Sequence, residues 1–177
     1  MGKSSKYLIP LKSLSEGVHE YEYTLDDAFF GHIDSSEITK GTVAAVLTVH
    51  RTGDIFELHF DIQGNIVIPC DRCLDDMTLP VATEETLYVK FGEEYREEDD
   101  NLIVVPETEG TIDVAWYLYE FVALTIPLKH THKEGECNPE MEKILQAHSS
   151  VEASDDDESE TTDPRWNALK KLKETNN

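Results

Sequence analysis

A long alternation of apolar and polar residues between Gly41 and Phe91 constrains the fold of this chain more than any other feature of its sequence. Alternation with a period of two, rich in Val, Ile and Thr, is typical of β-strands that bury one face. Short polar turns separate the apolar runs, and connections of this length join antiparallel neighbours. We therefore predict an antiparallel meander, with strands over residues 42–51, 55–62, 66–68 and 79–91 and turns at residues 52–54 and 63–65.

Shorter strand patterns flank the meander. On its N-terminal side, residues 7–11 and 18–25 alternate, and on its C-terminal side residues 102–105 form a short apolar run. The intervening segment 92–101 is polar and acidic, so we expect an exposed, mobile loop there.

Two segments favour helices. Residues 113–124 are apolar nearly all round, which is typical of a helix buried against a sheet. Ile112 and Asp113 are expected to open this helix, with Asp113 as its N-cap, and Pro127 to end it. Residues 139–147 carry a weaker helical pattern. We predict an α+β fold: a mainly antiparallel β meander with one buried helix and peripheral helices, in which the sheet could close partly into a barrel.

The chain changes character after residue 148. The next residues include almost no apolar side chains and many acids, so they cannot bury enough surface to order themselves. An amphipathic helix follows, with Trp166, Leu169 and Leu172 on one face as candidate partner-binding residues. The alternative is that this helix folds back onto its own domain. We predict three parts: a single domain over residues 1–148, an acidic disordered linker over 149–162 and a C-terminal docking helix over 163–174.

The charge of the chain is strongly negative, with 37 acidic and 15 basic residues and a net charge of −22. Binding to naked nucleic acid through its phosphates is therefore unfavourable. A basic protein partner fits this charge better. The alternative is that the acidic surface only maintains solubility.

Neither membrane segments nor known catalytic motifs stand out. No apolar region of signal-peptide length follows Met1, and the run from Val114 to Leu128 is too short to span a bilayer. Phosphate-binding glycine loops, nucleophile elbows and metalloprotease helices are not found in the sequence. We expect a cytoplasmic protein that is not an enzyme, with no small-molecule substrate and no membrane partner.

Five residues are candidate metal ligands. Cys70 and Cys73 form a C-x-x-C pair after a strand that Pro69 ends, and this spacing suits two thiolates on one zinc ion. If bound, one structural zinc ion would be the cofactor of this chain. The alternative is a pair of cysteines half-buried at a strand end. The loop after the buried helix offers the further candidates His130, His132 and Cys137.

Redox chemistry is another interpretation of the same pair. Thioredoxin-type cysteines sit at a helix N-terminus, where the thiolate is favoured, whereas this pair follows a strand. Asp71, Asp75 and Asp76 are close in sequence and should raise the pKa of the thiols, although Arg72 opposes them. We therefore favour zinc over redox chemistry, and we retain Arg72 as a candidate partner-binding residue.

Several motifs, in this order along the chain, resemble those of the large ribosomal RNA subunit accumulation protein family (YceD-like). The first is Cys70-Asp71-Arg72-Cys73-Leu74, which resembles the family's C-x-R-C-L signature. An acidic loop, the buried helix and a loop with His and Cys follow. The chain then ends in Asp163-Pro164-Arg165-Trp166, continued by Asn167-Ala168-Leu169-Lys170-Lys171-Leu172, which is similar to that family's usual ending. The resemblance covers roughly residues 46–172.

The resemblance implies an accessory protein of ribosome biogenesis, associated with accumulation or processing of large-subunit ribosomal RNA. We expect a non-catalytic factor whose partner is a basic ribosomal protein or a large-subunit precursor, with ribosomal RNA contacted indirectly. A zinc-stabilised RNA-binding module is one alternative, and an enzyme acting on ribosomal RNA precursors is another. Some family members carry a fuller cysteine cluster after the helix, where this chain has only Cys137 with two histidines.

Overall fold

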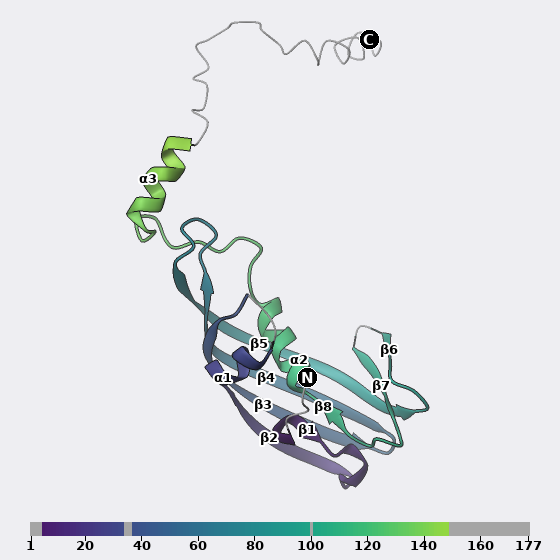
Figure 1. The fold of residues 1–177 in the computed structure, drawn as a ribbon. Coiled ribbons are helices and arrows are strands. Elements are labelled where there is room, and N and C mark those ends of the chain that lie inside the picture. Colours follow the sequence, from purple (N-terminus) through teal and green to yellow (C-terminus); the bar gives the residue numbers. More distant parts are fainter. Residues whose placement is uncertain (1–4, 34–36, 100, 149–177) are drawn as a thin grey trace, which may run out of the picture.

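The computed structural model describes residues 5–33, 37–99 and 101–148 (Figure 1). Its main feature is a six-stranded sheet in the order β2-β3-β4-β5-β7-β6. A second, two-stranded sheet pairs β1 with β8. The sheet strands are β1 (Leu8–Ile9), β2 (Gly17–Leu25), β3 (Lys40–Thr52), β4 (Ile55–Pro69), β5 (Asp76–Gly92), β6 (Arg96–Asp99), β7 (Leu102–Pro106) and β8 (Ile112–Asp113). The helices are α1 (Asp27–His32), α2 (Ala115–Leu124) and α3 (Pro139–His148), with short 3-10 helices at Ser5–Tyr7 and Leu11–Ser13.

The predicted α+β class is confirmed, and the sheet is mostly antiparallel. β2 to β5 form the expected meander, each strand pairing antiparallel with the next. The sheet is not antiparallel throughout, because β7 pairs with β5 in parallel and β6 returns along the outer edge of β7. Within the described residues β2 and β6 each pair with a single neighbour, so the sheet is open rather than partly closed into a barrel.

One predicted turn is wrong. Residues 63–65 do not end a strand, because β4 runs without interruption from Ile55 to Pro69 and pairs along its length with β5. A Cβ atom on Gly64 would lie 2.4 Å from the carbonyl oxygen of Thr42 and 2.6 Å from the Cα of Val43. The glycine therefore marks a close approach of two strand backbones rather than a turn.

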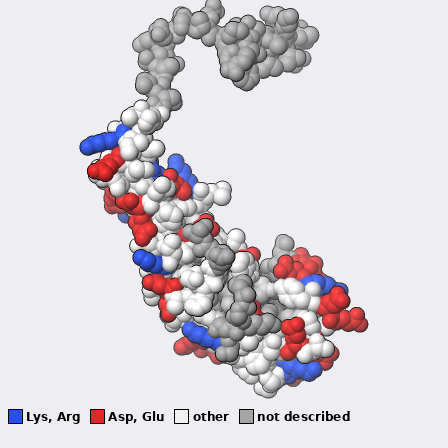
Figure 2. All heavy atoms as spheres, in the orientation of Figure 1, with Lys and Arg blue, Asp and Glu red and all other residues white. Residues whose placement is uncertain are grey.

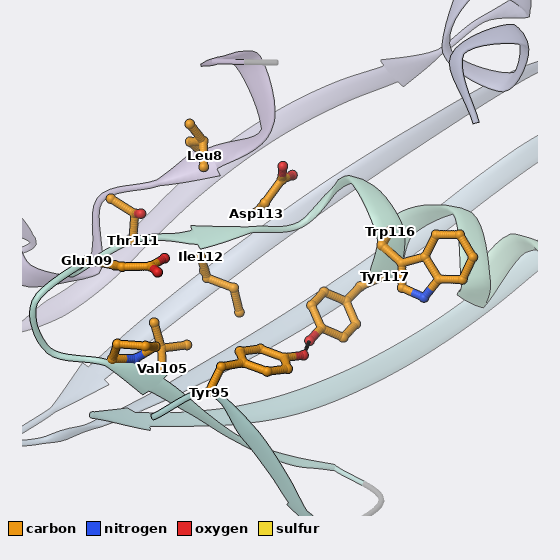
Figure 3. Close-up of a pocket in the computed structure, with 10 residues that line it drawn as sticks. Leu8, Tyr95, Val105, Glu109, Thr111, Ile112, Asp113, Trp116 and Tyr117 are labelled. Atoms are coloured by element: carbon orange, nitrogen blue, oxygen red, sulfur yellow. Dashed lines mark hydrogen bonds between the residues drawn. The ribbon is translucent and has the colours of Figure 1, made fainter. Parts of the chain in front are cut away.

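Two further boundaries differ from the sequence-based expectation. The predicted acidic loop contains β6, whose residues are all exposed, so no apolar alternation reveals the strand. Ile112 and Asp113 do not open the helix; they form β8 beside β1 (Figure 3), and α2 begins at Ala115. Asp113 nevertheless accepts a hydrogen bond from the Ala115 N–H at 3.0 Å, so it supports the start of α2 from one position further back than a regular N-cap.

The main hydrophobic core lies between one face of the sheet and the elements that cross it. In Figure 1, α1, α2 and the β1–β8 pair lie over the same face. The ring of Phe121 from α2 packs edge-on against Phe60 of β4, with centroids 5.1 Å apart. α2 is buried on one side only, since Trp116 and Leu124 are 52% and 72% exposed. The predicted burial of this helix against the sheet is therefore confirmed, and the structure adds that α2 keeps one exposed apolar edge.

Acidic side chains gather on the surface near β6 and β7 (Figure 2). Lys90 and Arg96 offset part of this charge through ion pairs with Glu98. No helix in the described part of the chain is long and apolar enough to cross a membrane. The predicted linker 149–162 and docking helix 163–174, with Trp166, Leu169 and Leu172, lie outside the described residues.

Candidate metal centre

The β4–β5 hairpin extends beyond the rest of the sheet, and its tip carries Cys70 and Cys73 (Figure 1). The tip is closed by two hydrogen bonds of 2.9 Å: Leu74 N–H donates to the Cys70 carbonyl, and Cys70 N–H donates to the Asp75 carbonyl. Leu74 adopts a positive φ of 64°, a conformation that costs a non-glycine residue about 1–2 kcal/mol. This turn folds the backbone so that both thiols face one side.

The segment after α2 is fastened to this tip through Asp71. Asp71 N–H donates to the carbonyl of His130 at 2.9 Å, and His130 N–H donates to the Asp71 carboxylate at 2.8 Å. The His130 ring lies against the same carboxylate, with Nε2 3.4 Å from Oδ1. His130 therefore holds the two segments together. Its ring lies outside the four side chains that could hold a metal ion, Cys70, Cys73, His132 and Cys137, which we call the metal-ligand group.

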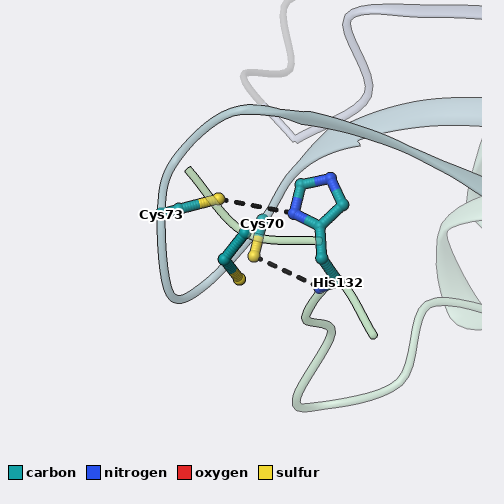
Figure 4. A group of neighbouring side chains, drawn as sticks. Cys70, Cys73 and His132 are labelled. Atoms are coloured by element: carbon teal, nitrogen blue, oxygen red, sulfur yellow. Dashed lines mark hydrogen bonds between the residues drawn. The ribbon is translucent and has the colours of Figure 1, made fainter. Parts of the chain in front are cut away.

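Four of the five candidate ligands come together. Cys70, Cys73 and Cys137 each offer Sγ and His132 offers a ring nitrogen, and these four atoms all lie within 4.8 Å of one another. The Cys73 Sγ is 3.3 Å from His132 Nδ1 (Figure 4). Ligand atoms about 2.3 Å from a tetrahedral metal lie about 3.8 Å apart, so a shift of less than about 1 Å would close this group around one ion. Three cysteines and one histidine are a ligand set of structural zinc sites.

The second nitrogen of His132 fixes which atom faces the sulfurs. Its Nε2 lies 3.3 Å from the carbonyl oxygen of Asp76, which can only accept a hydrogen bond. In the neutral ring Nε2 therefore carries the proton, and Nδ1 has a lone pair directed at the cysteines. A hydrogen bond of this kind orients metal-ligating histidines and raises their basicity.

The surroundings of Cys70 favour the thiolate form of its side chain. Burial alone would raise its pKa, but hydrogen bonds outweigh burial and lower the pKa of Cys70 to about 6. This corrects the expectation that the neighbouring aspartates raise the pKa, because backbone donors at the hairpin tip point at the sulfur. The donors are the N–H groups of Cys73, His132 and Arg72, with a contribution from the Cys73 side chain.

Two other groups of this cluster, Cys137 and His132, have raised pKa values. Burial, followed by hydrogen bonds with Cys73 and Cys70, raises the pKa of Cys137 to about 11. Hydrogen bonds with Cys70 and Cys73 raise the pKa of His132. These directions follow from placing several potentially anionic sulfurs together, and a bound cation would reverse both by favouring thiolates and neutral imidazole.

The cysteines form a small second core, separate from the main one. Cys70, Cys73 and Cys137 are buried, and Met77 and Met141 pack against them. Cys70 and Cys73 lie in the turn of a β-hairpin, whereas a thioredoxin-type pair lies in the first turn of a helix, so this pair does not have the thioredoxin arrangement.

α3 is joined to this second core by polar contacts. The Asn138 side chain accepts from the Glu140 N–H at 3.0 Å and donates to Asp75 at 3.1 Å, so it caps the helix and binds the tip. Arg72, the candidate partner-binding residue at the tip, forms an ion pair with Glu142 at 3.9 Å. The sequence interpretation did not single out Asn138, although an Asn directly before Pro139 is a typical helix start.

Comparisons with known proteins agree with the motifs. The model of the family described as "Large ribosomal RNA subunit accumulation protein YceD" matches residues 58–173. A protein of Bacillus subtilis (strain 168), "Uncharacterized protein YlbN", is 31% identical over 118 residues, which is 64% of this chain. The match spans 63% of the length of that protein. No solved structure matches the chain.

The family match contains both segments of the metal-ligand group. Residues 58–173 include the hairpin tip with Cys70 and Cys73 and the segment with His132 and Cys137. It also includes α2, which separates the two segments in sequence. The chain therefore belongs to the YceD family of large ribosomal RNA subunit accumulation proteins.

Proposed function

We propose that this chain is a non-catalytic ribosome biogenesis factor that promotes accumulation or processing of large-subunit ribosomal RNA. It acts in the cytoplasm by binding a basic ribosomal protein or an assembling large-subunit particle. The observation that carries this proposal is the family match over residues 58–173, because the family is named for large ribosomal RNA subunit accumulation. The net charge of −22 supports a basic protein rather than bare RNA as the direct partner.

The metal-ligand group supports binding rather than catalysis. It has four protein ligands, and a structural zinc site with four protein ligands leaves no open position for a substrate or an activated water. We propose that zinc, if bound, stabilises the hairpin tip and the segment after α2. An enzyme acting on ribosomal RNA precursors remains the last-ranked alternative, since the chain offers no known catalytic motif.

Affinity purification of the full chain at low salt tests the proposal. We expect large-subunit proteins or precursors to co-purify, and depletion of the chain to lower the ratio of large-subunit to small-subunit ribosomal RNA. Recovery of the chain alone, together with an unchanged RNA ratio after depletion, would contradict it.

A zinc-stabilised RNA-binding module is the second candidate, and the Cys70, Cys73, His132 and Cys137 group favours it. Elemental analysis should give one zinc per chain, with zinc lost in Cys70→Ser and in His132→Ala. His130→Ala is the matched control and should retain zinc, because its ring faces Asp71 instead of the sulfurs. Tight RNA binding that weakens steeply with salt would favour this candidate over the first.

A further inference from the structure

A cavity of about 290 Å³ lies between β8, the β6–β7 hairpin and the start of α2 (Figure 3). This volume is close to the lower limit, about 300 Å³, of ordinary small-molecule sites, so it suits the side chains of a peptide better than a large cofactor. We call it the aromatic–acidic cavity. Its lining includes Tyr95, Glu109, Thr111, Asp113, Trp116 and Tyr117.

The tyrosines of this cavity form a hydrogen-bonded chain. The hydroxyls of Tyr95 and Tyr117 are 2.8 Å apart, and Tyr95 also donates to the Glu97 carboxylate at 3.4 Å. Each hydroxyl has one proton. If Tyr95 gives its proton to Glu97, Tyr117 must give its own to Tyr95, and both hydroxyls retain only lone pairs for a ligand. Burial and the hydrogen bond with Tyr95 raise the pKa of Tyr117, so this phenol stays neutral.

The remaining polar side chains add acceptors, two of them charged. Glu109 and Asp113 are acceptors when ionised, and a carboxylate has about four lone-pair sites, so each can take a ligand as well as a neighbour within the chain. The Thr111 hydroxyl can donate or accept a hydrogen bond, and the indole N–H of Trp116 can only donate one. This excess of acceptors requires a ligand rich in donors.

The exposed aromatic rings of the cavity also favour a cationic ligand. Trp116 is 52% and Tyr95 54% exposed, although large aromatic side chains are usually covered. The face of a Trp or Tyr ring attracts guanidinium and ammonium groups within about 6 Å, and Trp is the strongest of these rings.

We propose that the aromatic–acidic cavity binds the arginine or lysine side chains of an extended basic segment of a partner protein. Trp116 and Glu109 lie toward opposite ends of the cavity, with the two tyrosine hydroxyls between them (Figure 3). One cation of the segment therefore lies against the Trp116 ring, near the tyrosine oxygens, and a second cation of the same segment donates hydrogen bonds to Glu109. In the described part of the chain β8 pairs only with β1, and its other edge borders the cavity, so the partner's backbone can align along β8. The inference relies on the proposed function for its choice of a basic protein.

RNA is the competing ligand, because bases also stack on exposed aromatic rings. The acidic side chains around the cavity oppose it: Glu109 and Asp113 line the cavity, and Glu97 ends the tyrosine chain. Each would lie close to a phosphate backbone and repel it.

Calorimetric titration of the full chain with a short blocked peptide that alternates glycine and arginine tests the proposal. We expect saturable binding, at least about fivefold weaker for the same peptide with uncharged citrulline in place of arginine. Glu109→Gln and Trp116→Ala should each weaken binding about fivefold or more. Glu22→Gln is the matched control, because it removes the same charge from the solvent-facing side of β2 and should leave the affinity unchanged. In a Trp166→Phe background, Trp116 fluorescence should change as the peptide binds.

Four results would overturn the proposal. If Glu22→Gln weakened peptide binding as much as Glu109→Gln, the effect would come from the overall charge of the chain and not from the cavity. If the citrulline peptide bound as tightly as the arginine peptide, the positive charge of arginine would not be recognised. Oligouridylate that binds with the same dependence on Trp116 would make the cavity an RNA site. Displacement of the arginine peptide by a peptide of residues 163–177 would make the chain's own tail the occupant.

The outcome is separable from that of the proposed function. Co-purification of large-subunit precursors that is unaffected by Glu109→Gln would leave the proposed function standing and remove this cavity as the contact. Binding of the arginine peptide without any co-purifying ribosomal component would support the cavity as a site for a basic segment and contradict the proposed function.

Discussion

His130 and His132 are two positions apart in the same segment, and their rings have different environments. His130 faces the Asp71 carboxylate, with Nε2 3.4 Å from Oδ1. His132 directs Nδ1 at Cys73 Sγ, 3.3 Å away, because its Nε2 is hydrogen-bonded to the Asp76 carbonyl. The two rings are therefore distinguished by their partners: the Asp71 carboxylate for His130 and the Asp76 carbonyl for His132.

The protonation states of the metal-ligand group predict how zinc affinity depends on pH. Zinc requires thiolates and a neutral imidazole, so binding releases protons and its affinity rises with pH. Cys70, with a pKa of about 6, is a thiolate above about pH 6 and gains a proton below it. Cys137, with a pKa of about 11, must lose its proton on binding at any pH near neutral. We expect zinc affinity to fall steeply from about pH 8 to about pH 5, measured by competition with a chromophoric chelator.

His130→Ala should show the same pH profile, because its ring is outside the ligand group. His132→Ala should bind zinc more weakly and with a shallower profile, since one titrating ligand is lost. An affinity independent of pH in the unaltered chain would show that these side chains do not bind the metal.

At the scale of elements, the long β4–β5 hairpin determines the position of the candidate site. Its strands have 15 and 17 residues, more than twice the usual five or six. One end lies in the main sheet, where Phe56 and Leu58 are fully buried, and the other carries the cysteines. The unbroken pairing through Gly64 therefore keeps the tip at a fixed distance from the core.

Gly64→Ala should destabilise the fold, because the new methyl group would meet the backbone of Thr42 and Val43, which cannot rotate away. We expect a loss of about 2 kcal/mol or more in the free energy of unfolding, measured by urea denaturation. Gly31→Ala is the control: it lies in α1 with no atom within 4 Å of the added Cβ, and should be neutral or stabilising by up to about 1 kcal/mol. Equal stability of the two variants would contradict the close approach of β3 and β4.

On the scale of the whole molecule, the structure has two hydrophobic cores of very different size. The main core joins the sheet to α1 and α2, whereas the second consists of three cysteines with Met77 and Met141. α3 has no buried residue, so it depends on the second core and on its contacts through Asn138 and Glu142. The tip and α3 are therefore the part whose local stability a metal ion would control.

Removal of zinc from the loaded chain should loosen one end of the molecule and leave the other intact. We expect chelation to increase amide hydrogen exchange in residues 70–75 and 130–148, while the amides of β3 and β4 keep their protection. The Cys70→Ser chain should show the same local loosening without chelator. Loss of protection in β3 and β4 as well would mean that the metal supports the main core.

Regular patterns explain why much of the fold was predictable. The alternation in β2, β3 and β5 reports burial on one face directly, and the apolar run of α2 marks a helix against the sheet. The sequence did not predict β6, because an exposed edge strand carries no apolar alternation. It did not predict the continuity of β4 either, because a glycine between polar residues is typical of a turn, and the close approach of β3 at Gly64 is visible only in the structure.

The sequence by itself determined the α+β class, the five candidate ligands and the resemblance to the YceD family, because these depend on residue types and their order. The tertiary structure decided which ligands meet. Cys73 and His132 are 59 positions apart, and no spacing rule predicts that they lie 3.3 Å from each other. It also assigned His130 to Asp71 and lowered the pKa of Cys70 through backbone N–H groups. Distances between remote segments depend on how α2 crosses the sheet, and local sequence does not encode that crossing.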